Sequence, residues 1–377
     1  MSTSSKPSKS KKNTSAASSD KSASLPDHLE AMRTRVFVKP THLEHTHEAE
    51  DPDAFHAVGY DNSFSMEKFK RNLKIKIIEL THDTIVFDLI GVGAPIANAL
   101  RRILLSDVPT MAIEKVILFQ NTSIIQDEVL AHRLGLVPIY ADPSKFEYLH
   151  ENDDIPTEHN TTVFTLEVAC TPGPNSALGE YKNGSVYSSQ LQWIPQGSQA
   201  ERFKDDPIRP VYDDIVIAKL RPGQSIEAEL HVVKGIGRDH AKWSPVSTAF
   251  YRQMPDITFN EPFLGEEAKQ LAELCPMGVF DIEDMGNGPQ AVVGDARSCT
   301  MCRECIRDPK HEKRINLRRV RDHFIFTIES VGAIPPEELF RRAIAELKNK
   351  VAVIADALDT NNANVPKHIE IAWEQDQ

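Results

Sequence analysis

One predicted helix, over residues 94–108, constrains this chain more than any other stretch. It follows Gly93 and contains Pro95, which suits the first turn of a helix because that turn needs no backbone N–H donor. Pro109 ends it, since proline cannot continue a helix. Any fold must therefore bury one apolar helical face, against the chain's own core or against a partner. That face consists of Ile96, Ala99, Leu100, Ile103 and Leu104.

The segments on either side of this helix have the two-residue period of β-strands. Residues 72–80 alternate apolar side chains with lysines, which predicts a half-buried strand, and residues 84–90 predict a second strand of the same hairpin. After the helix, residues 111–119 again favour a strand. Asp127 is expected to cap a short helix that Gly135 ends. The region is therefore predicted to be an antiparallel sheet with helices packed on it.

The second half of the chain contains a further strand pattern and a long helix. Residues 213–220 and 225–233 flank Arg221-Pro222-Gly223, which predicts a β-hairpin. Residues from Pro336 onward favour a helix whose apolar side chains are spaced four and three apart, as in a coiled-coil seam. The seam residues are Phe340, Ile344, Leu347, Val351, Ile354 and Leu358. An amphipathic helix of this length needs a covering surface for its seam.

Four of the five cysteines form a recognisable spacing. Cys299, Cys302 and Cys305 are separated by two residues each, and Cys275 is followed by a proline. This spacing is typical of cysteines that hold an iron–sulfur cluster, and four thiolates also satisfy zinc. The alternative is a structural segment that keeps its thiols without a metal. The spacing alone leaves both readings open.

Length and charge exclude several classes of protein. With 377 residues, 40% of them hydrophobic, the chain is long enough for two globular units, while its Ser- and Lys-rich first 24 residues favour disorder. A formal charge of -12 argues against a broad nucleic-acid surface, so little direct DNA contact is expected. The sequence shows no membrane span, secretory signal, P-loop or catalytic carboxylate motif. Gly235-Ile-Gly237 is only a weak phosphate-loop signal.

The order of motifs around the first helix resembles the alpha-like subunits of cellular RNA polymerases. The resemblance rests on the helix with Arg101 and Arg102, the run from Val108 to Glu114, and the run from Asp127 to Leu136. It extends over roughly residues 72–358. Among the members, the chain is most similar to the larger alpha-like subunit shared by eukaryotic polymerases I and III. The third-largest polymerase II subunit, the archaeal D subunit and bacterial alpha are its relatives.

The resemblance implies an α+β fold with a split domain. A dimerisation domain, an antiparallel sheet with two long helices, is expected at residues 66–109 and 315–377. An inserted mixed α/β domain is expected at 110–314, with a ferredoxin-like, cysteine-containing segment at 260–310. Residues 1–65 are expected to form a disordered tail and an extended linker, and residues 365–373 to add an edge strand.

The resemblance also implies a non-catalytic assembly role in the nucleus, in the nucleolus and the nucleoplasm. The chain would pair with a smaller alpha-like subunit and then carry the largest, second-largest and small polymerase subunits in rRNA, 5S rRNA and tRNA transcription. Trp243 would contact another subunit. The cysteines resemble an archaeal cluster-binding insertion, but no cofactor is certain. The implied dimer-interface residues are Ile96, Leu100, Arg101, Arg102, Ile103, Leu104, Phe340, Ile344, Leu347, Val351 and Ile354.

Two alternatives remain at this stage. The third-largest polymerase II subunit is disfavoured because it should carry a four-cysteine zinc loop soon after Leu136, and residues 141–160 contain no cysteine. An iron–sulfur electron-transfer or redox-sensing protein belongs to a different class. The cysteines support it, but no second cluster site, flavin motif or haem motif accompanies them.

Overall fold

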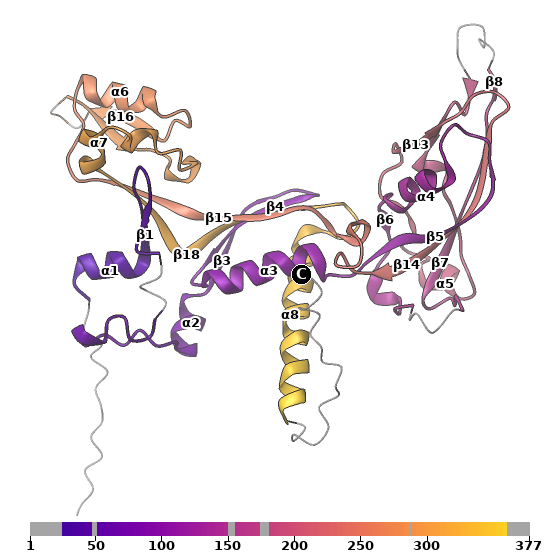
Figure 1. The fold of residues 1–377 in the computed structure, drawn as a ribbon, viewed down its shortest axis with the longest axis horizontal. Helices are drawn as coiled ribbons and strands as arrows, with labels where there is room; N and C mark the ends of the chain where they lie inside the picture. The colour runs from indigo at the N-terminus through magenta and orange to yellow at the C-terminus, as the bar shows by residue number, and fades with distance from the viewer. Residues whose placement is uncertain are drawn as a thin grey trace, which may run out of the picture. The chain divides into compact units, whose positions relative to one another are not determined.

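The computed structural model describes residues 25–46, 51–149, 155–173, 181–284, 286 and 288–359 (Figure 1). The chain divides into two compact units. One consists of Met1–Lys70 and Pro255–Val320, and the other of Arg71–Met254 and Arg321–Gln377. Strands β15 (Val246–Phe259) and β18 (Ile315–Ser330) each have residues in both units. Within the described residues the fold is a mixed α/β arrangement of antiparallel sheets and eight α-helices, and none of those helices is long and apolar enough to cross a membrane.

The first unit contains the cysteine segment. Its β1 pairs antiparallel with the start of β18, so residues 35–38, placed by the sequence analysis in a linker, form a strand. Strands β16 and β17 form a hairpin. In the core of this first unit, Phe263, Leu271 and Ile306 are completely or almost completely buried. The elements are α1 (Asp27–Thr34), β1 (Arg35–Val38), β2 (Leu43–Glu44), α2 (Met66–Asn72, at the boundary), α6 (Glu266–Leu274), β16 (Phe280–Asp284), β17 (Pro289–Val293) and α7 (Pro309–Arg314).

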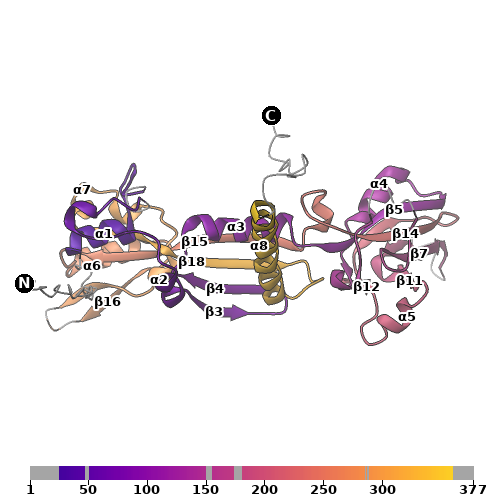
Figure 2. The same cartoon turned by 90° about the horizontal axis from the view of Figure 1, so that it is seen from below.

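In the second unit, β3 (Lys74–Leu80), β4 (Thr84–Ile90) and the second half of β18 form an antiparallel sheet (Figure 2). The predicted 72–90 hairpin is confirmed. Helices α3 (Ala94–Ser106) and α8 (Pro336–Asp359) pack on each other. Phe87 of β4 stacks on Phe326 of β18 at 5.3 Å between ring centres, and Phe340 of α8 meets the Phe87 ring edge-on at 4.8 Å. These rings fix the start of α8 on the sheet.

The burial predicted for β3 is wrong. All seven of its residues are exposed, and Ile75, Ile77 and Leu80 retain 50–55% of their accessible surface. The reason is the position of β3 in the sheet, because it is the edge strand next to β4. An alternating pattern identifies a strand but not what covers it.

A second sheet in this unit has the order β11-β7-β14-β5. Its inner face carries a large core, with Phe164, Leu166 and Leu230 fully buried. The elements of this part are β5 (Thr110–Asn121), α4 (Asp127–Gly135), β6 (Ile139–Tyr140), β7 (Thr161–Ala169), β8 (Thr171–Pro172), β9 (Tyr181–Lys182), β10 (Ser185–Tyr187), β11 (Gln192–Ile194), α5 (Gln199–Arg202), β12 (Arg209–Pro210), β13 (Val216–Lys219) and β14 (Ser225–Gly235).

Two local predictions need correction. Residues 221–224 do form a turn, with Gly223 at φ +87°, but β13 pairs with β10 while β14 pairs with β5 and β7. The predicted hairpin is therefore absent from these residues, because the turn connects strands of different sheets. Gln126, not Asp127, is the N-cap of α4, and Asp127 lies in its first turn. The predicted tail at 1–24 and strand at 365–373 lie outside the described residues.

Candidate subunit interface and cysteine pocket

Helix α3 buries most of its apolar face inside the chain. Leu100, Ile103 and Leu104 are at most 5% exposed, whereas Ile96 at its first turn is 40% exposed. Arg102 is exposed, and Arg101 donates hydrogen bonds to the Asn98 side chain one turn earlier. The part of α3 that remains available to another chain is therefore its first turn and its arginine edge.

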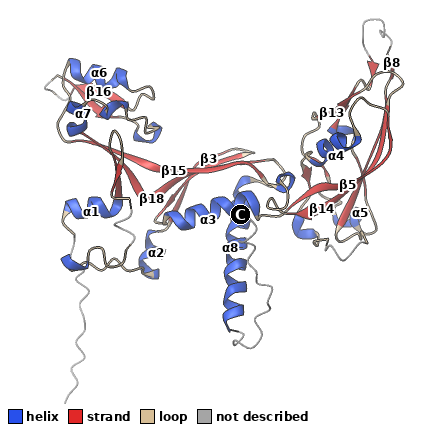
Figure 3. Cartoon of the chain, viewed as in Figure 1, coloured by secondary structure: helices blue, strands red, loops and turns tan. Residues whose placement is uncertain are grey.

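In helix α8 the apolar side chains of the first turns are buried and most of those further along are exposed, the opposite of α3. Its first turns are anchored, with Leu339 and Ala343 fully buried and Phe340 9% exposed. Figure 3 shows α8 as one continuous helix, and from Ile344 onward most of its apolar seam is exposed. The exposed fractions are 46% for Ile344, 59% for Val351, 54% for Ile354 and 77% for Leu358, and Leu347 is half-buried. The structure thus leaves a stripe of large aliphatic side chains uncovered along the last four turns of the helix.

Asp107, the C-cap residue of α3, links three segments. Its side chain is 9% exposed and accepts hydrogen bonds from Lys350 of α8 at 2.9 Å and from Arg238 at 3.0 Å. A carboxylate at the C-terminal end of a helix is unfavourable to the helix dipole, and the two cations offset that effect. Sequence reasoning missed Asp107. The signal available was an acid directly after a helix that lacks a basic last turn.

The Gly235–Trp243 loop is a packing element. A Cβ at Gly237 would lie 2.3 Å from the Leu105 carbonyl oxygen, and a Cβ at Gly235 would lie 2.4 Å from the Trp243 ring. Both positions therefore require glycine, because the backbone there lies too close to its neighbour to leave room for a side chain. Trp243 is 7% exposed and donates a hydrogen bond to the Val233 carbonyl at 3.2 Å. The ring lies inside the chain, and the subunit contact predicted for it stays a prediction.

The four spaced cysteines line one pocket in the first unit, together with Ile257 and Leu317. All four are reduced. Within Cys299–Cys305 the backbone adopts positive φ at Met301 and Arg303, and the Met301 N–H donates to Cys299 Sγ at 3.4 Å. The loop buries Cys305 and part of Cys299, while Cys302 stays exposed at the pocket.

Cys305, the buried cysteine of this pocket, favours the thiol over the thiolate. The pKa of Cys305 is raised to about 12, mainly by burial and in smaller part by charge repulsion from Cys299, Cys302 and Cys275. In the part of the chain that the structure describes, no three His, Cys, Asp or Glu side chains are close enough to hold a metal ion. The donor type and shared pocket suit a soft metal, but the sulfur positions do not form a coordination set.

Comparisons with known proteins agree with this geometry. Residues 86–351 match the family described as the RNA polymerase Rpb3/Rpb11 dimerisation domain. The mouse protein named DNA-directed RNA polymerases I and III subunit RPAC1 is 46% identical over 337 residues, 88% of this chain and 97% of that protein. In Dictyostelium discoideum, the polymerases I and III subunit rpac1 is 47% identical over 333 residues, 88% of this chain and 95% of that protein. The polymerase II subunit rpb3 of the same organism is 32% identical over 301 residues, 78% of this chain and 97% of that protein.

Proposed function

Because this chain belongs to the RNA polymerase Rpb3/Rpb11 dimerisation family, we propose that it is the larger alpha-like subunit of DNA-directed RNA polymerases I and III. Its role is assembly: it pairs with a smaller alpha-like subunit, and the pair carries the two large subunits and the small subunits. The proposed location is the nucleus, in both nucleolus and nucleoplasm. We propose residues 66–109 and 315–377 as the dimerisation domain and residues 110–314 as the inserted domain.

The observation that carries this proposal is the uncovered seam of α8. Ile344, Val351 and Ile354 have the coiled-coil spacing of an interface, yet each is about half exposed in the isolated chain. Soluble proteins rarely leave such a contiguous apolar stripe uncovered unless it is a binding surface. Ile96 in the first turn of α3 and Arg102 are also exposed and belong to the proposed interface, while Leu100, Ile103 and Leu104 are buried in the core.

The experiment is co-purification of the full-length chain with a small alpha-like subunit. We expect a one-to-one heterodimer in gel filtration and, in cells, recovery of the large subunits of both polymerases with the tagged chain. Recovery of polymerase II subunits alone would contradict the assignment. The purified chain should incorporate no nucleotide and hydrolyse no NTP, because its sequence lacks a P-loop and a catalytic carboxylate motif.

The polymerase II alternative has less support. Within one organism the identity is 47% to the polymerases I and III subunit and 32% to the polymerase II subunit, over similar lengths. The redox-protein alternative rests on the cysteines alone. A soluble, coloured protein free of polymerase subunits would support it instead.

We propose further that Cys275, Cys299, Cys302 and Cys305 are the ligands if the cysteine pocket takes a metal centre. Bound zinc or an iron–sulfur cluster would cross-link α6 to the Cys299–Cys305 loop, and its binding energy would add to the folding energy of the segment. The sulfurs must first deprotonate and move together, since they form no coordination set here. Iron and zinc analysis after anaerobic purification tests this, with Cys170→Ser as the control and Cys302→Ser as the variant. Sub-stoichiometric metal in every preparation would contradict the metal site and show that the four cysteines are plain thiols.

A further inference from the structure

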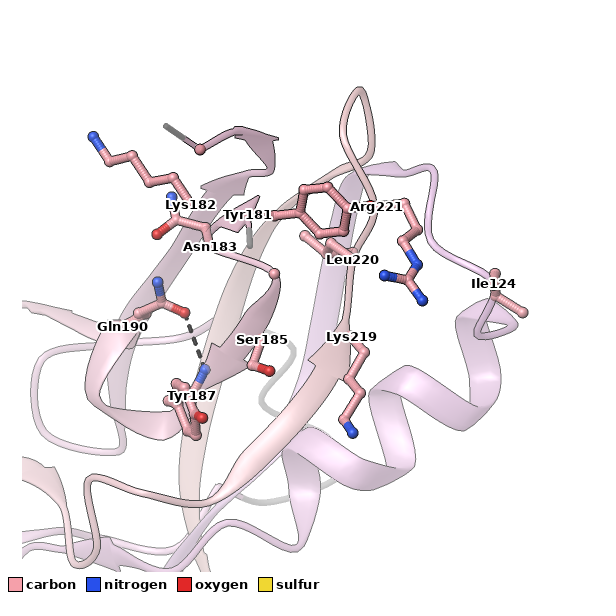
Figure 4. A pocket seen from close by; sticks show the side chains of 12 residues that line it. Ile124, Tyr181, Lys182, Asn183, Ser185, Tyr187, Gln190, Lys219, Leu220 and Arg221 are labelled. Atoms are coloured by element: carbon pink, nitrogen blue, oxygen red, sulfur yellow. Dashed lines mark hydrogen bonds between the residues drawn. The ribbon is translucent and has the colours of Figure 1, made fainter. Parts of the chain in front are cut away.

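The second unit contains an open pocket of about 1030 Å³, lined by none of the residues assigned above to the proposed dimer interface (Figure 4). It is lined by Gly173, by β9 and β10, and by the end of β13 with the turn that follows. Its floor is ordered by local hydrogen bonds. The Gln190 side chain accepts the Tyr187 N–H at 3.0 Å, and the Leu220 N–H donates to the Gly184 carbonyl at 2.9 Å. These hydrogen bonds fix the segments that line the pocket.

Three cations line this pocket from different elements. Lys182 lies on β9, Lys219 on β13 and Arg221 on the turn after it, and all three side chains are exposed. Among the described residues no acidic side chain lines the pocket. The chain as a whole has 55 acidic and 43 basic side chains, so this local excess of positive charge runs against its overall composition.

The same surface is partly apolar. The Arg221 guanidinium lies 5.5 Å from the centre of the Tyr181 ring, which holds the cation over an aromatic wall. Tyr187 is 40% exposed, and Ile124 at the rim is 82% exposed. An exposed isoleucine offers nothing to a phosphate backbone. It does offer a contact to an aliphatic or aromatic side chain.

We propose that this pocket binds an acidic peptide segment of a protein partner, one in which carboxylates alternate with apolar side chains. Carboxylates would pair with Lys182, Lys219 and Arg221, and an apolar side chain would lie against Ile124 and the tyrosines. A single-stranded nucleic acid is the less suitable occupant. Three cations neutralise few phosphates, and the acidic chain repels the rest of the strand.

The test measures fluorescence anisotropy of a short fluorescein-labelled peptide of Glu, Asp and Phe residues with the full-length chain. We expect saturable binding that weakens as salt is raised. Replacing Lys182→Glu and Lys219→Glu together should raise the Kd about tenfold or more. The matched control is Lys115→Glu with Lys204→Glu, two exposed lysines of the same unit that do not line the pocket. It makes the same change in net charge and should leave the Kd within about twofold.

Several outcomes would overturn the proposal. They are the absence of saturable binding up to about 1 mM peptide, equal binding of the Gln, Asn and Phe analogue, and equal loss in the control variant. Tighter binding of an oligouridylate that the pocket variant abolishes would assign the pocket to single-stranded RNA instead. Unchanged circular dichroism and Tm in both double variants verify that each chain remains folded.

Discussion

Replacing Val351 of α8 by aspartate separates interface formation from folding. Val351 is 59% exposed in the isolated chain, so the substitution removes little internal packing. We expect the Tm of the chain alone to remain within the small range typical of surface substitutions, about 0.5 kcal/mol in stability. The proposed partner is then the only structure that the new carboxylate disturbs.

The expected loss of binding follows from the exposed fraction. Full burial of a valine contributes roughly 1.5–3 kcal/mol, and more than half of that surface is still available to a partner, which gives about 1–2 kcal/mol. An unpaired carboxylate in a desolvated seam adds several kcal/mol. The sum is about 4 kcal/mol or more, roughly a thousandfold rise in Kd for the smaller alpha-like subunit.

Val353 provides the matched control. It has the same side chain, lies on the same helix and is 60% exposed, but it is outside the four-and-three spacing of the seam. Isothermal titration of both variants with the purified small subunit should show binding lost for Val351→Asp and kept for Val353→Asp. Equal affinities in the two variants, at either level, would refute the assignment of the seam as the interface.

Further predictions concern packing and protonation. Leu100→Ala should destabilise the chain by about 3 kcal/mol in urea unfolding, because Leu100 is 5% exposed and its removal leaves a cavity. Gly237→Ala should lower stability by about 2 kcal/mol because its Cβ would lie 2.3 Å from the Leu105 carbonyl. Gly223→Ala, where φ is +87° but space is open, should lose only about 1 kcal/mol. In the metal-free chain the pKa of Cys305 is about 12, above the roughly 8.5 of an unfolded thiol. The folded state therefore keeps a proton that the unfolded state releases, so urea stability should fall as pH rises above about 8.5, and less so in Cys305→Ala.

Local patterns predicted the elements that form the proposed interface. Pro95 and the apolar period identified α3, and the spacing from Phe340 to Leu358 identified α8 and the side that bears its seam. These features depend only on neighbours along the helix. The cysteine spacing also predicted that the four cysteines lie together, and all four line one pocket.

The predictions that were wrong or missing concern features that depend on contacts between residues distant in sequence. The pattern of β3 did not reveal that it is an edge strand, and the turn at Gly223 did not reveal that β13 and β14 belong to different sheets. The roles of Asp107 and Gly237 became visible only when Lys350 and Leu105 were placed beside them. Spacing also could not distinguish Leu100, buried by its own chain, from Val351, which is left to a partner.

The bond between Asp107 and Lys350 has a mechanical consequence for α8. Leu339, Phe340 and Ala343 anchor the first turns of the helix, Leu347 is half-buried, and further along Lys350 donates to Asp107 at the C-terminal end of α3. Eight residues separate Lys350 from Leu358, a lever of about 12 Å at the rise of an α-helix. A tilt of about 10° at Lys350 would therefore move Leu358 sideways by about 2 Å, roughly half the distance between packed carbon atoms. The hydrogen bond from Lys350 to Asp107 therefore restricts how far α8 can tilt, and with it the position of the seam that a partner would contact.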